Sequence, residues 1–337
     1  MQRQEYAEMF ARIERDGADA RVHWASGPRA GRCEPWDGRP ESLPGHPARF
    51  HGASCRESEE GIAYAEELMG APRLLILGAG HVGAGHVGVA TAALAATLGF
   101  QITVVDARPE FAVPERVPGA QEVICAPYEE ALRAQPAYAN AYTVIVTPGH
   151  ASDRVCAAAA LRRPFAYIGM IGSRGKVATV RAALLEQGFT AEEFDQIHAP
   201  IGLPLGGREP AEIAVSICAE MIQVRSARGA RVIEPAVRSG LRALAEDPQA
   251  RGALATIIGH GGSVPRGVGS RMLIGPDGLI AGSVGGGAVE AAVLRRGREL
   301  CGQPGAVDLM DLDLSDREGA ELGMICGGRV RVLVESL

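Results

Sequence analysis

The chain has 337 residues, enough for two domains that each bury a core of their own. Its composition is that of an ordinary soluble globular protein, and a net charge of −6 argues against binding to nucleic acid or anionic membranes. No apolar run approaches the roughly 20 residues that a membrane-spanning helix needs.

The N-terminal sequence and the cysteines favour a cytoplasmic protein. The segment MQRQEYAEMFARIERD lacks the apolar core of a secretory signal peptide. The seven cysteines are an odd number without the spacing of a disulfide framework. Such cysteines are typical of reduced thiols in a cytoplasm.

Residues 1–70 are expected to form an N-terminal helix and an irregular segment. Apolar residues at helical spacing predict an amphipathic helix over residues 5–15. A strand is expected at Arg21–Trp24, an irregular stretch at Ser26–Glu60 and a helix at Gly61–Met69. The irregular stretch contains Cys33, His46, His51 and Cys55. Scattered cysteines and histidines can bind a metal, but without a CxxC or HxxxH pair these four are better explained as residues of a surface loop.

The stretch Leu74–Asp106 has the layout of a dinucleotide-binding βαβ unit. It reads LLILGAGHVGAGHVGVATAALAATLGFQITVVD, with an apolar run, a glycine-rich turn, an alanine-rich segment, a second apolar run and an acidic residue. The glycines permit a tight turn, and the helix that follows offers free N–H groups to a pyrophosphate. Asp106 is placed to accept hydrogen bonds from a ribose hydroxyl.

The glycine fingerprint occurs twice in overlapping registers. Both GAGHVG copies share Gly83, and the spacing from Gly83 to Asp106 is closer to the usual distance of about 20 residues than the spacing from Gly78. Because glycine disfavours helix, an enlarged loop is expected between Leu77 and Val89. The alternative is a Rossmann domain that has kept its turn but no longer binds a dinucleotide.

Alternating strands and helices continue beyond Asp106 and predict an α/β fold with a doubly wound parallel sheet. Strands are expected at Glu122–Ala126, Tyr142–Thr147 and Phe165–Ile171, and helices at Glu129–Arg133, Asp153–Leu161, Lys176–Gln187 and from Pro210 to about Arg225. Ligands of such sheets lie beyond the carboxyl ends of the strands.

Two of these strand ends carry polar residues. One is Thr147-Pro-Gly-His150-Ala-Ser-Asp153, and the other is a turn from Gly169 to Lys176 that offers a hydroxyl and two cations as a phosphate cradle. The alternative is that Ser152 or Asp153 caps a helix while the two cations are solvated. The expected cofactor-binding residues of this domain, residues 71–227, are Gly78, Gly80, Gly83, Gly85, Gly88, Asp106, His150, Asp153, Ser173, Arg174 and Lys176.

Residues 228–337 are expected to form a smaller, glycine-rich α+β domain. A helix at Ala236–Glu246 is followed by a strand at Leu254–Ile258, a hairpin around Pro276-Asp277-Gly278, a helix at Ala288–Leu300 and a strand at Arg329–Glu335. Three glycine clusters can expose backbone amides to an anion, and Arg266 can add contacts to a phosphate. The expected cofactor-binding residues here are Gly262, Arg266, Gly285, Gly286, Gly287, Glu290, Gly327 and Gly328.

Two of the polar residues in this domain have plainer explanations. Cys326, in the sequence ICGG, is the one thiol placed where a ligand can approach, but a lone cysteine is usually a small buried apolar residue. Glu290 can simply complement the N-terminus of its helix.

Together these motifs resemble the xanthine dehydrogenase accessory family, XdhC/CoxI. The matching segments in the Rossmann part are LLILGAGHVG, VVDARPEF, YIGMIGSRGK and APIGLPLGG with EPAEIAVSICAEMI. In the last domain they are GGSVPRGVGSRMLI, GSVGGGAVE and ICGG. The order of the two domains is the reverse of the order usual in that family, in which the CoxI-like domain comes first.

The resemblance implies a maturation factor for a molybdenum hydroxylase, a xanthine dehydrogenase or an aldehyde oxidoreductase. Such a factor binds the molybdenum cofactor (molybdopterin, possibly in a dinucleotide form), assists its sulfuration with a cysteine desulfurase and inserts it into the apoenzyme. It implies an accessory factor rather than an enzyme, with a homodimer as one arrangement. Cys326 would lie near the molybdenum as a soft ligand, and Arg266, the Gly285–Gly287 turn and Glu290 would hold the cofactor.

Two other functions remain open from the residues alone. An NAD(P)-dependent oxidoreductase would explain the Rossmann pattern, although His150 is the only histidine noted at a strand end and has no evident partner in the sequence. A nucleotide-sensing protein that acts on a partner would bind nucleotide without retaining a pterin.

Overall fold

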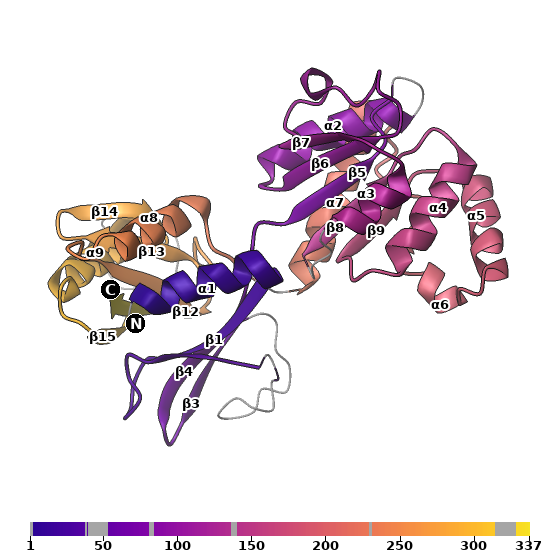
Figure 1. The fold of residues 1–337 in the computed structure, drawn as a ribbon. Coiled ribbons are helices and arrows are strands. Elements are labelled where there is room, and N and C mark those ends of the chain that lie inside the picture. The colour runs from indigo at the N-terminus through magenta and orange to yellow at the C-terminus, as the bar shows by residue number, and fades with distance from the viewer. Residues whose placement is uncertain are drawn as a thin grey trace. The chain divides into compact units, whose positions relative to one another are not determined.

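The computed structural model describes residues 3–37, 39, 53–80, 84–135, 140–228, 231–313 and 328–337. The chain divides into two compact units (Figure 1). The first unit combines residues 1–70 with residues 229–337, and the second, the Rossmann unit, consists of residues 71–228. The N-terminal 70 residues are therefore part of the same unit as the C-terminal domain, and not a separate segment.

The Rossmann unit contains one parallel sheet of six strands in the order β10-β9-β8-β5-β6-β7. This is the strand order of a dinucleotide-binding fold, and the order reverses between β5 and β8. The strands are β5 (Arg73–Leu77), β6 (Gln101–Asp106), β7 (Glu122–Cys125), β8 (Ala141–Ile145), β9 (Tyr167–Met170) and β10 (Ile197–His198).

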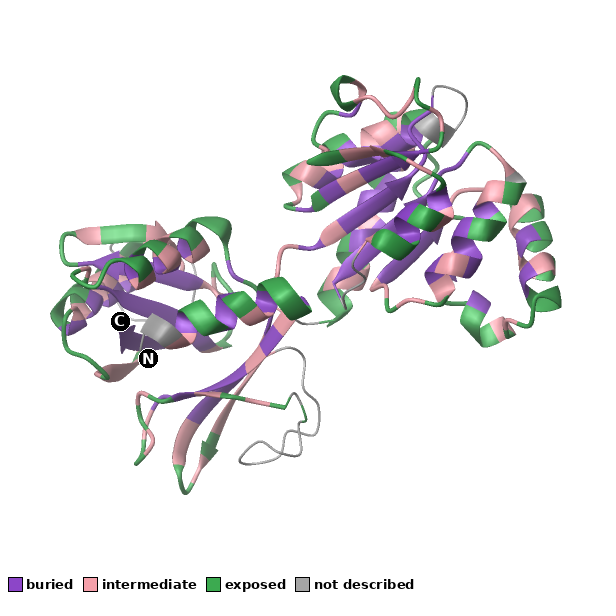
Figure 2. Ribbon diagram, viewed as in Figure 1, coloured by how far each residue is buried: buried purple, intermediate pink, exposed green. Residues whose placement is uncertain are grey.

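Helices cover both faces of this sheet, which confirms the doubly wound α/β architecture. One apolar cluster joins the sheet to α2 (Ala84–Thr97) and α7 (Pro210–Arg228). The other joins it to α3 (Tyr128–Ala134), α4 (His150–Leu161), α5 (Arg174–Glu186) and α6 (Ala191–Phe194). Figure 2 shows the central strands as almost continuously buried, as expected for strands with helices on both sides.

The first unit contains two sheets. One has the order β11-β4-β1-β2 with β3 also paired to β4, and the other is antiparallel in the order β14-β13-β12-β16-β15. The elements are α1 (Arg3–Asp16), β1 (Ala18–Trp24), β2 (Cys33–Pro35), β3 (Ala53–Ser58), β4 (Gly61–Met69), β11 (Arg231–Val232), α8 (Pro235–Glu246), β12 (Ala253–Gly261), β13 (Arg271–Gly275), β14 (Gly278–Gly282), α9 (Gly287–Leu300), β15 (Val307–Asp313) and β16 (Arg329–Ser336).

Shared apolar clusters explain why the two chain segments form one unit. Tyr6, Phe10 and other residues of α1 pack with Leu241 of α8 and Leu273 of β13. A second cluster joins Tyr64 of β4 to strands β12 and β16 of the other sheet. Neither segment buries its apolar face without the other.

Three expectations for local structure are wrong. Gly61–Met69 is a strand and not a helix, because it pairs with β1 on one side and with β3 on the other, and such pairing overrides helix propensity. The stretch Ser26–Glu60, expected to be irregular, contains β2 and β3. The third concerns the glycine loop: α2 begins at Ala84 and includes Gly85 and Gly88.

Among the described residues, no helix is long and apolar enough to cross a membrane. This finding covers the helices of both units.

Candidate functional site

In an ordinary fingerprint a single glycine motif provides both the tight turn and the close approach of the helix to the sheet. In this chain these two roles are divided between the two copies of the motif. Gly78 has a φ of +118°, and a Cβ atom there would overlap the carbonyl oxygen of Val146. A Cβ atom at Gly88 would in turn overlap the carbonyl oxygen of Gly78. The first copy therefore supplies the glycine of the turn, and the second supplies the glycine that lets α2 approach the sheet. Gly83 lies outside the described residues, and Gly85 is in the first turn of α2.

Asp106 lies at the carboxyl end of β6 and is completely buried. Its Oδ2 accepts hydrogen bonds from the amide of Ala79 and from Nη2 of Arg108, both at 2.9 Å. Its Oδ1 accepts from the amide of Arg108 at 3.1 Å and from Nε of Arg108 at 2.9 Å. Burial would raise the pKa of this carboxyl, but the hydrogen bonds from Arg108 and Ala79 lower it below its ordinary value, so Asp106 is ionised.

The guanidinium of Arg108 lies beside Gly80 of the glycine motif. A side chain at Gly80 would occupy the place of this guanidinium, so the second glycine of the motif makes room for it. The same guanidinium lies 4.0 Å from the ring centroid of Phe111, and that of Arg116 lies 5.1 Å from the same centroid. The end of β6 thus carries two cations around one aromatic ring.

A pocket of about 520 Å³ opens beside this cluster. Arg116 and His86 contribute its polar side chains, and α2 contributes an apolar wall. Its volume lies within the range of about 300–1,000 Å³ that is typical of small-molecule sites. The remaining lining residues are Ala79, Val89, Ala90 and Ala93.

The two polar strand ends, of which the second was expected to form a phosphate cradle, are connected by a buried ion pair. Asp153, in the first turn of α4, accepts a hydrogen bond from the hydroxyl of Thr147 at 2.6 Å and pairs with Lys176 of α5. Asp153 therefore does not cap its helix, and Lys176 is not simply solvated, because only 17% of its side chain is exposed. The charge of Lys176 is balanced within the protein, which weakens its attraction for a phosphate.

The other residues of that turn have separate surroundings. Ser173 caps α5, its hydroxyl accepting a hydrogen bond from the amide of Lys176 at 3.3 Å. Arg174 is exposed in the first turn of α5. His150 is the first residue of α4, which follows the carboxyl end of β8.

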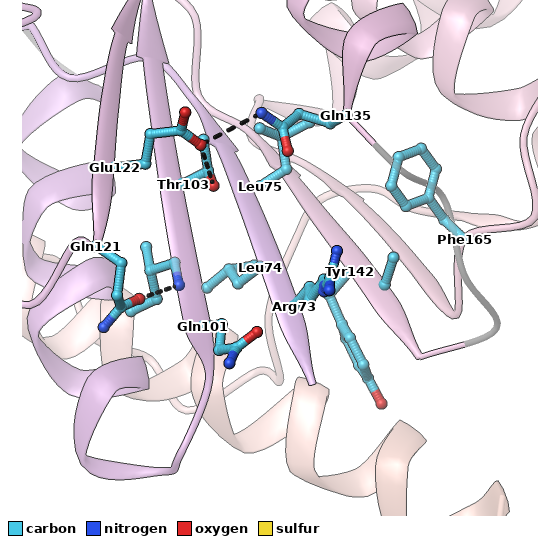
Figure 3. Close-up of a pocket in the computed structure, with 12 residues that line it drawn as sticks. Arg73, Leu74, Leu75, Gln101, Thr103, Gln121, Glu122, Gln135, Tyr142 and Phe165 are labelled. Carbon is cyan, nitrogen blue, oxygen red and sulfur yellow. Dashed lines mark hydrogen bonds between the residues drawn. The ribbon is translucent and has the colours of Figure 1, made fainter. Parts of the chain in front are cut away.

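A second pocket, of about 350 Å³, lies at the amino ends of the strands of this sheet (Figure 3). Its polar side chains are largely paired with one another. Glu122 accepts hydrogen bonds from Thr103 at 3.2 Å and from Gln135 at 3.4 Å, and Gln121 accepts one from the amide of Ile102 at 2.5 Å. Because ligands of parallel sheets bind at the carboxyl ends of the strands, this pocket is not at the position expected for a nucleotide site.

A hydrogen-bonded triad of Glu220, Tyr167 and the half-buried His198 at the outer edge of the Rossmann sheet was not expected from the sequence. Glu220 of α7 accepts hydrogen bonds from the hydroxyl of Tyr167 at 2.6 Å and the amide of Gly202 at 2.8 Å, and lies 3.1 Å from Nδ1 of His198. Burial opposes ionisation of Glu220, but His198 and Tyr167 lower its pKa below the ordinary value. His198 of β10 therefore has a carboxylate partner, Glu220. It lies on a different strand from β8, the strand that precedes His150.

The glycine clusters of the first unit lie close to one another. A Cβ atom at Gly328 would meet Ser263 and Val264 of the segment after β12, and one at Gly285 would lie 3.8 Å from Pro265. Arg266 is exposed on this segment, and among the described residues it has no ion-pair partner. Gly262 has a φ of +71°. Cys326 and Gly327 lie outside the described residues.

The turn before α9 presents backbone amides without a side-chain cap. Gly285, Gly286 and Gly287 have φ values of +128°, +85° and +58°, and no heavy atom lies within 4 Å of a Cβ atom built on Gly286. The N-cap Gly286 makes no side-chain cap hydrogen bond, although the amide of Gly285 donates to the hydroxyl of Ser283 at 3.2 Å. Glu290 is half-buried in the first turn of the helix.

A buried charged cluster crosses the core of the first unit, and no motif in the sequence indicates it. Glu66 of β4 is fully buried and pairs with Arg271 of β13. It also accepts a hydrogen bond from the hydroxyl of Tyr64 at 3.0 Å and lies 3.0 Å from Nε2 of His23. Nδ1 of His23 lies 3.5 Å from Glu335 of β16. This cluster connects the N-terminal segment to the C-terminal segment.

Comparison with known proteins gives matches to two family models. The XdhC Rossmann domain matches residues 74–221, and the XdhC and CoxI family matches residues 245–311. The first match lies within the Rossmann unit, and the second lies within the C-terminal part of the first unit.

The chain is also similar to two curated proteins. The chain is 32% identical over 207 residues to the uncharacterized protein YqeB of Escherichia coli, covering 58% of this chain and 37% of that one. It is 30% identical over 162 residues to a probable xanthine dehydrogenase subunit of Bacillus subtilis, covering 48% of this chain and 46% of that one. The matched part spans less than half of either relative.

The solved structure supports the fold. A crystal structure described as a xanthine dehydrogenase from Bacillus halodurans has a TM-score of 0.50 and 22% identity, with 67% of each chain covered. The two family models, which together match most of the chain, show that it belongs to the XdhC and CoxI family.

Proposed function

We propose that this protein is an accessory factor for a molybdenum hydroxylase, a xanthine dehydrogenase or an aldehyde oxidoreductase. In this proposal it binds the molybdenum cofactor, assists its sulfuration and inserts it into the apoenzyme. The presence of both family models on one chain is the observation that carries the proposal. The likeness to a protein named as a probable xanthine dehydrogenase subunit supports the choice of client class.

The glycine turns of the first unit fit the phosphate of a pterin cofactor. The turn Gly285–Gly287 offers amides at the N-terminus of α9, with open space above Gly286. Arg266, exposed and without an ion-pair partner among the described residues, can add a planar pair of donors. Once inserted into the client, the molybdenum cofactor supplies the oxygen-transfer and redox chemistry of hydroxylation, and the residues named here only hold and orient it.

The partners follow from the same proposal. The molybdenum hydroxylase apoenzyme receives the cofactor, and a cysteine desulfurase supplies the sulfur for its terminal ligand. We propose Cys326 as the thiol that acts beside the metal, because thiolate is a soft ligand suited to it. The Rossmann unit holds a nucleotide, and the factor works in the cytoplasm, with a homodimer as one arrangement.

A co-expression experiment tests the proposal. The full chain is produced with a xanthine dehydrogenase apoenzyme in a host that makes molybdenum cofactor, and hydroxylase activity and bound pterin fluorescence are measured. Arg266→Ala should lower pterin retention about ten-fold or more, and Arg266→Lys should recover only part of it because the fork geometry is lost. Arg295→Ala, which removes an exposed arginine of α9, serves as the control and should retain pterin normally.

The thiol is tested in the same system. Cys326→Ser should leave the melting temperature and pterin retention unchanged but reduce client activation, because sulfuration depends on the thiolate. Normal client activation by this variant would remove the chemical role of Cys326. The accessory function as a whole would be refuted if the unaltered chain retained no pterin and the client matured equally well when this protein was not co-expressed.

A further inference from the structure

We propose that the nucleotide site of the Rossmann unit selects an adenosine ribose that carries a 2′-phosphate, so that its ligand class is NADP rather than NAD. Arg108 and Arg116 are the specificity-determining residues. This inference rests on the nucleotide-binding part of the proposed function, and it concerns a different unit from the one proposed to hold the pterin.

The first step is that Asp106 cannot serve a ribose diol. In a dinucleotide fold, the acidic residue at the end of the second strand accepts a hydrogen bond from the ribose 2′-hydroxyl when NAD binds. A carboxylate has about four acceptor positions. In this chain four donors already fill them: the amide of Ala79, and the amide, Nε and Nη2 of Arg108. A 2′-hydroxyl would therefore have to displace Arg108 from a completely buried carboxylate.

The second step is that a cation stands where the ribose hydroxyls of NAD would need an acceptor. The side chain of Arg108 is 33% exposed, and its Nη1 takes no part in the contacts with Asp106. A Cβ atom built on Gly80 would lie closest to Nη2 and 3.3 Å from Nη1, so the guanidinium lies against the second glycine of the motif, beside the path that a dinucleotide takes in this fold. A phosphate can accept hydrogen bonds from a guanidinium, whereas a hydroxyl gains little from it.

The third step is the charge balance around Phe111. Asp106 neutralises Arg108, but among the described residues no carboxylate pairs with Arg116, whose Nη1 donates to the backbone carbonyl of Glu110 at 3.1 Å. Glu110 and Glu115 are exposed acidic residues of the same segment, and their carboxylates reduce the local positive charge without forming an ion pair with Arg116 among the described residues. The charge of Arg116 is therefore available to pair with an anionic group of a ligand.

The fourth step is the pocket. Arg116 lines the cavity of about 520 Å³ whose wall is formed by Ala79 and the first turns of α2. The apolar surface of that wall suits the flat face of an adenine, and His86 adds a polar group at the rim. Both the loop amide that binds Asp106 and the cation without a carboxylate partner thus border one cavity.

Isothermal titration of the full chain with two pairs of ligands tests the inference. We expect NADP⁺ to bind at least ten-fold more tightly than NAD⁺, and adenosine 2′,5′-bisphosphate at least ten-fold more tightly than 5′-AMP. Arg116→Gln should weaken NADP⁺ binding about ten-fold and leave NAD⁺ binding unchanged. Arg133→Gln removes an exposed cation of the same unit, which pairs with Glu129 on α3, and should change neither affinity.

A second variant tests the role of Arg108 separately. Arg108→Gln frees acceptor positions on Asp106, so the ratio of NADP⁺ to NAD⁺ affinity should fall at least ten-fold, with the melting temperature followed as a check on folding. Equal or tighter binding of NAD⁺ by the unaltered chain would overturn the inference, as would equal weakening of both dinucleotides by Arg116→Gln. Failure of both adenosine phosphates to bind would also overturn it, while pterin retention and client activation would be unaffected by that result.

Discussion

Replacing Glu66 by glutamine should destabilise the first unit strongly, because it removes the charge partner of a buried cation. Glu66 is fully buried, and only 4% of the Arg271 side chain is exposed. Burial opposes ionisation, but Arg271 and His23 lower the pKa of Glu66 from 4.5 to about 2. A carboxyl with that difference contributes about 3 kcal/mol of folding free energy at neutral pH. Breaking a buried ion pair by removing one partner typically costs about 3–5 kcal/mol, which agrees.

The measurement is urea unfolding of the full chain, monitored with spectroscopic probes that report the unfolding of each unit separately. Glu57→Gln is the matched control, since Glu57 makes an ion pair with Arg331 in the same unit but its side chain is 66% exposed. An exposed pair of this kind contributes about 0–1 kcal/mol. We expect the transition of the first unit to move for Glu66→Gln and the transition of the Rossmann unit to stay. A loss below about 1 kcal/mol for Glu66→Gln would refute the reasoning.

The same cluster predicts how stability depends on pH. Because the pKa of Glu66 is lowered on folding, its contribution is present above pH 4.5 and is lost as the pH falls toward about 2. Burial alone would lower the pKa of His23, but Cys33 and Glu335 raise it well above its ordinary value of 6.5. The contribution of His23 is therefore complete below pH 6.5 and is lost as the pH rises through the raised pKa. The first unit should therefore be most stable between pH 4.5 and pH 6.5. Glu66→Gln should reduce the loss of its stability at acidic pH.

Four further changes test other parts of the structure. Gly88→Ala should destabilise the Rossmann unit by about 1–3 kcal/mol in thermal unfolding, because the methyl group meets a backbone carbonyl. Gly175→Ala, in the first turn of α5 where the nearest atom is 4.0 Å away, should instead stabilise it by up to about 1 kcal/mol. Lys176→Met leaves Asp153 buried without its cation and should cost about 3–5 kcal/mol; an unchanged melting temperature would contradict the buried pairing. Replacing residues 71–228 by a short glycine-rich loop should leave the first unit folded by circular dichroism and one-dimensional NMR, and an unfolded product would show that the unit depends on the Rossmann domain.

The Rossmann unit was predictable because its signals are local. The apolar run Leu74–Leu77, the glycine turn and Asp106 lie in one short stretch, so their spacing predicts the fold. The start of α2 was not predictable, because the glycines that weaken a helix by propensity are required here by the approach of Gly88 to the turn.

The first unit was less predictable because its determinants lie far apart in the chain. Arg271, the partner of Glu66, is 205 residues away, and nothing near GIAYAEELM indicates that this glutamate is buried or that the segment is a strand. Glu220 and His198 are closer in sequence, but their contact depends on how α7 packs against the edge of the sheet. The sequence also did not predict that Arg108 occupies the acceptor positions of Asp106, because the motif VVDARPEF does not show in which direction the Arg108 side chain points.

The interruption of the first unit sets the order in which this chain can mature on the ribosome. Strand β4 ends just before the Rossmann unit, and β11, the first strand after it, pairs in parallel with the end of β4 through Arg231 and Val232. The Rossmann unit is one continuous segment and can fold as soon as it emerges. The antiparallel sheet of this unit instead requires β16, which pairs with both β12 and β15 and is synthesised after the other strands of the sheet. Until residues 229–337 have been synthesised, α1 lacks its partners in α8 and β13, and Tyr64 of β4 lacks its partners in β12 and β16, so a nascent chain with a folded Rossmann unit still exposes these apolar residues.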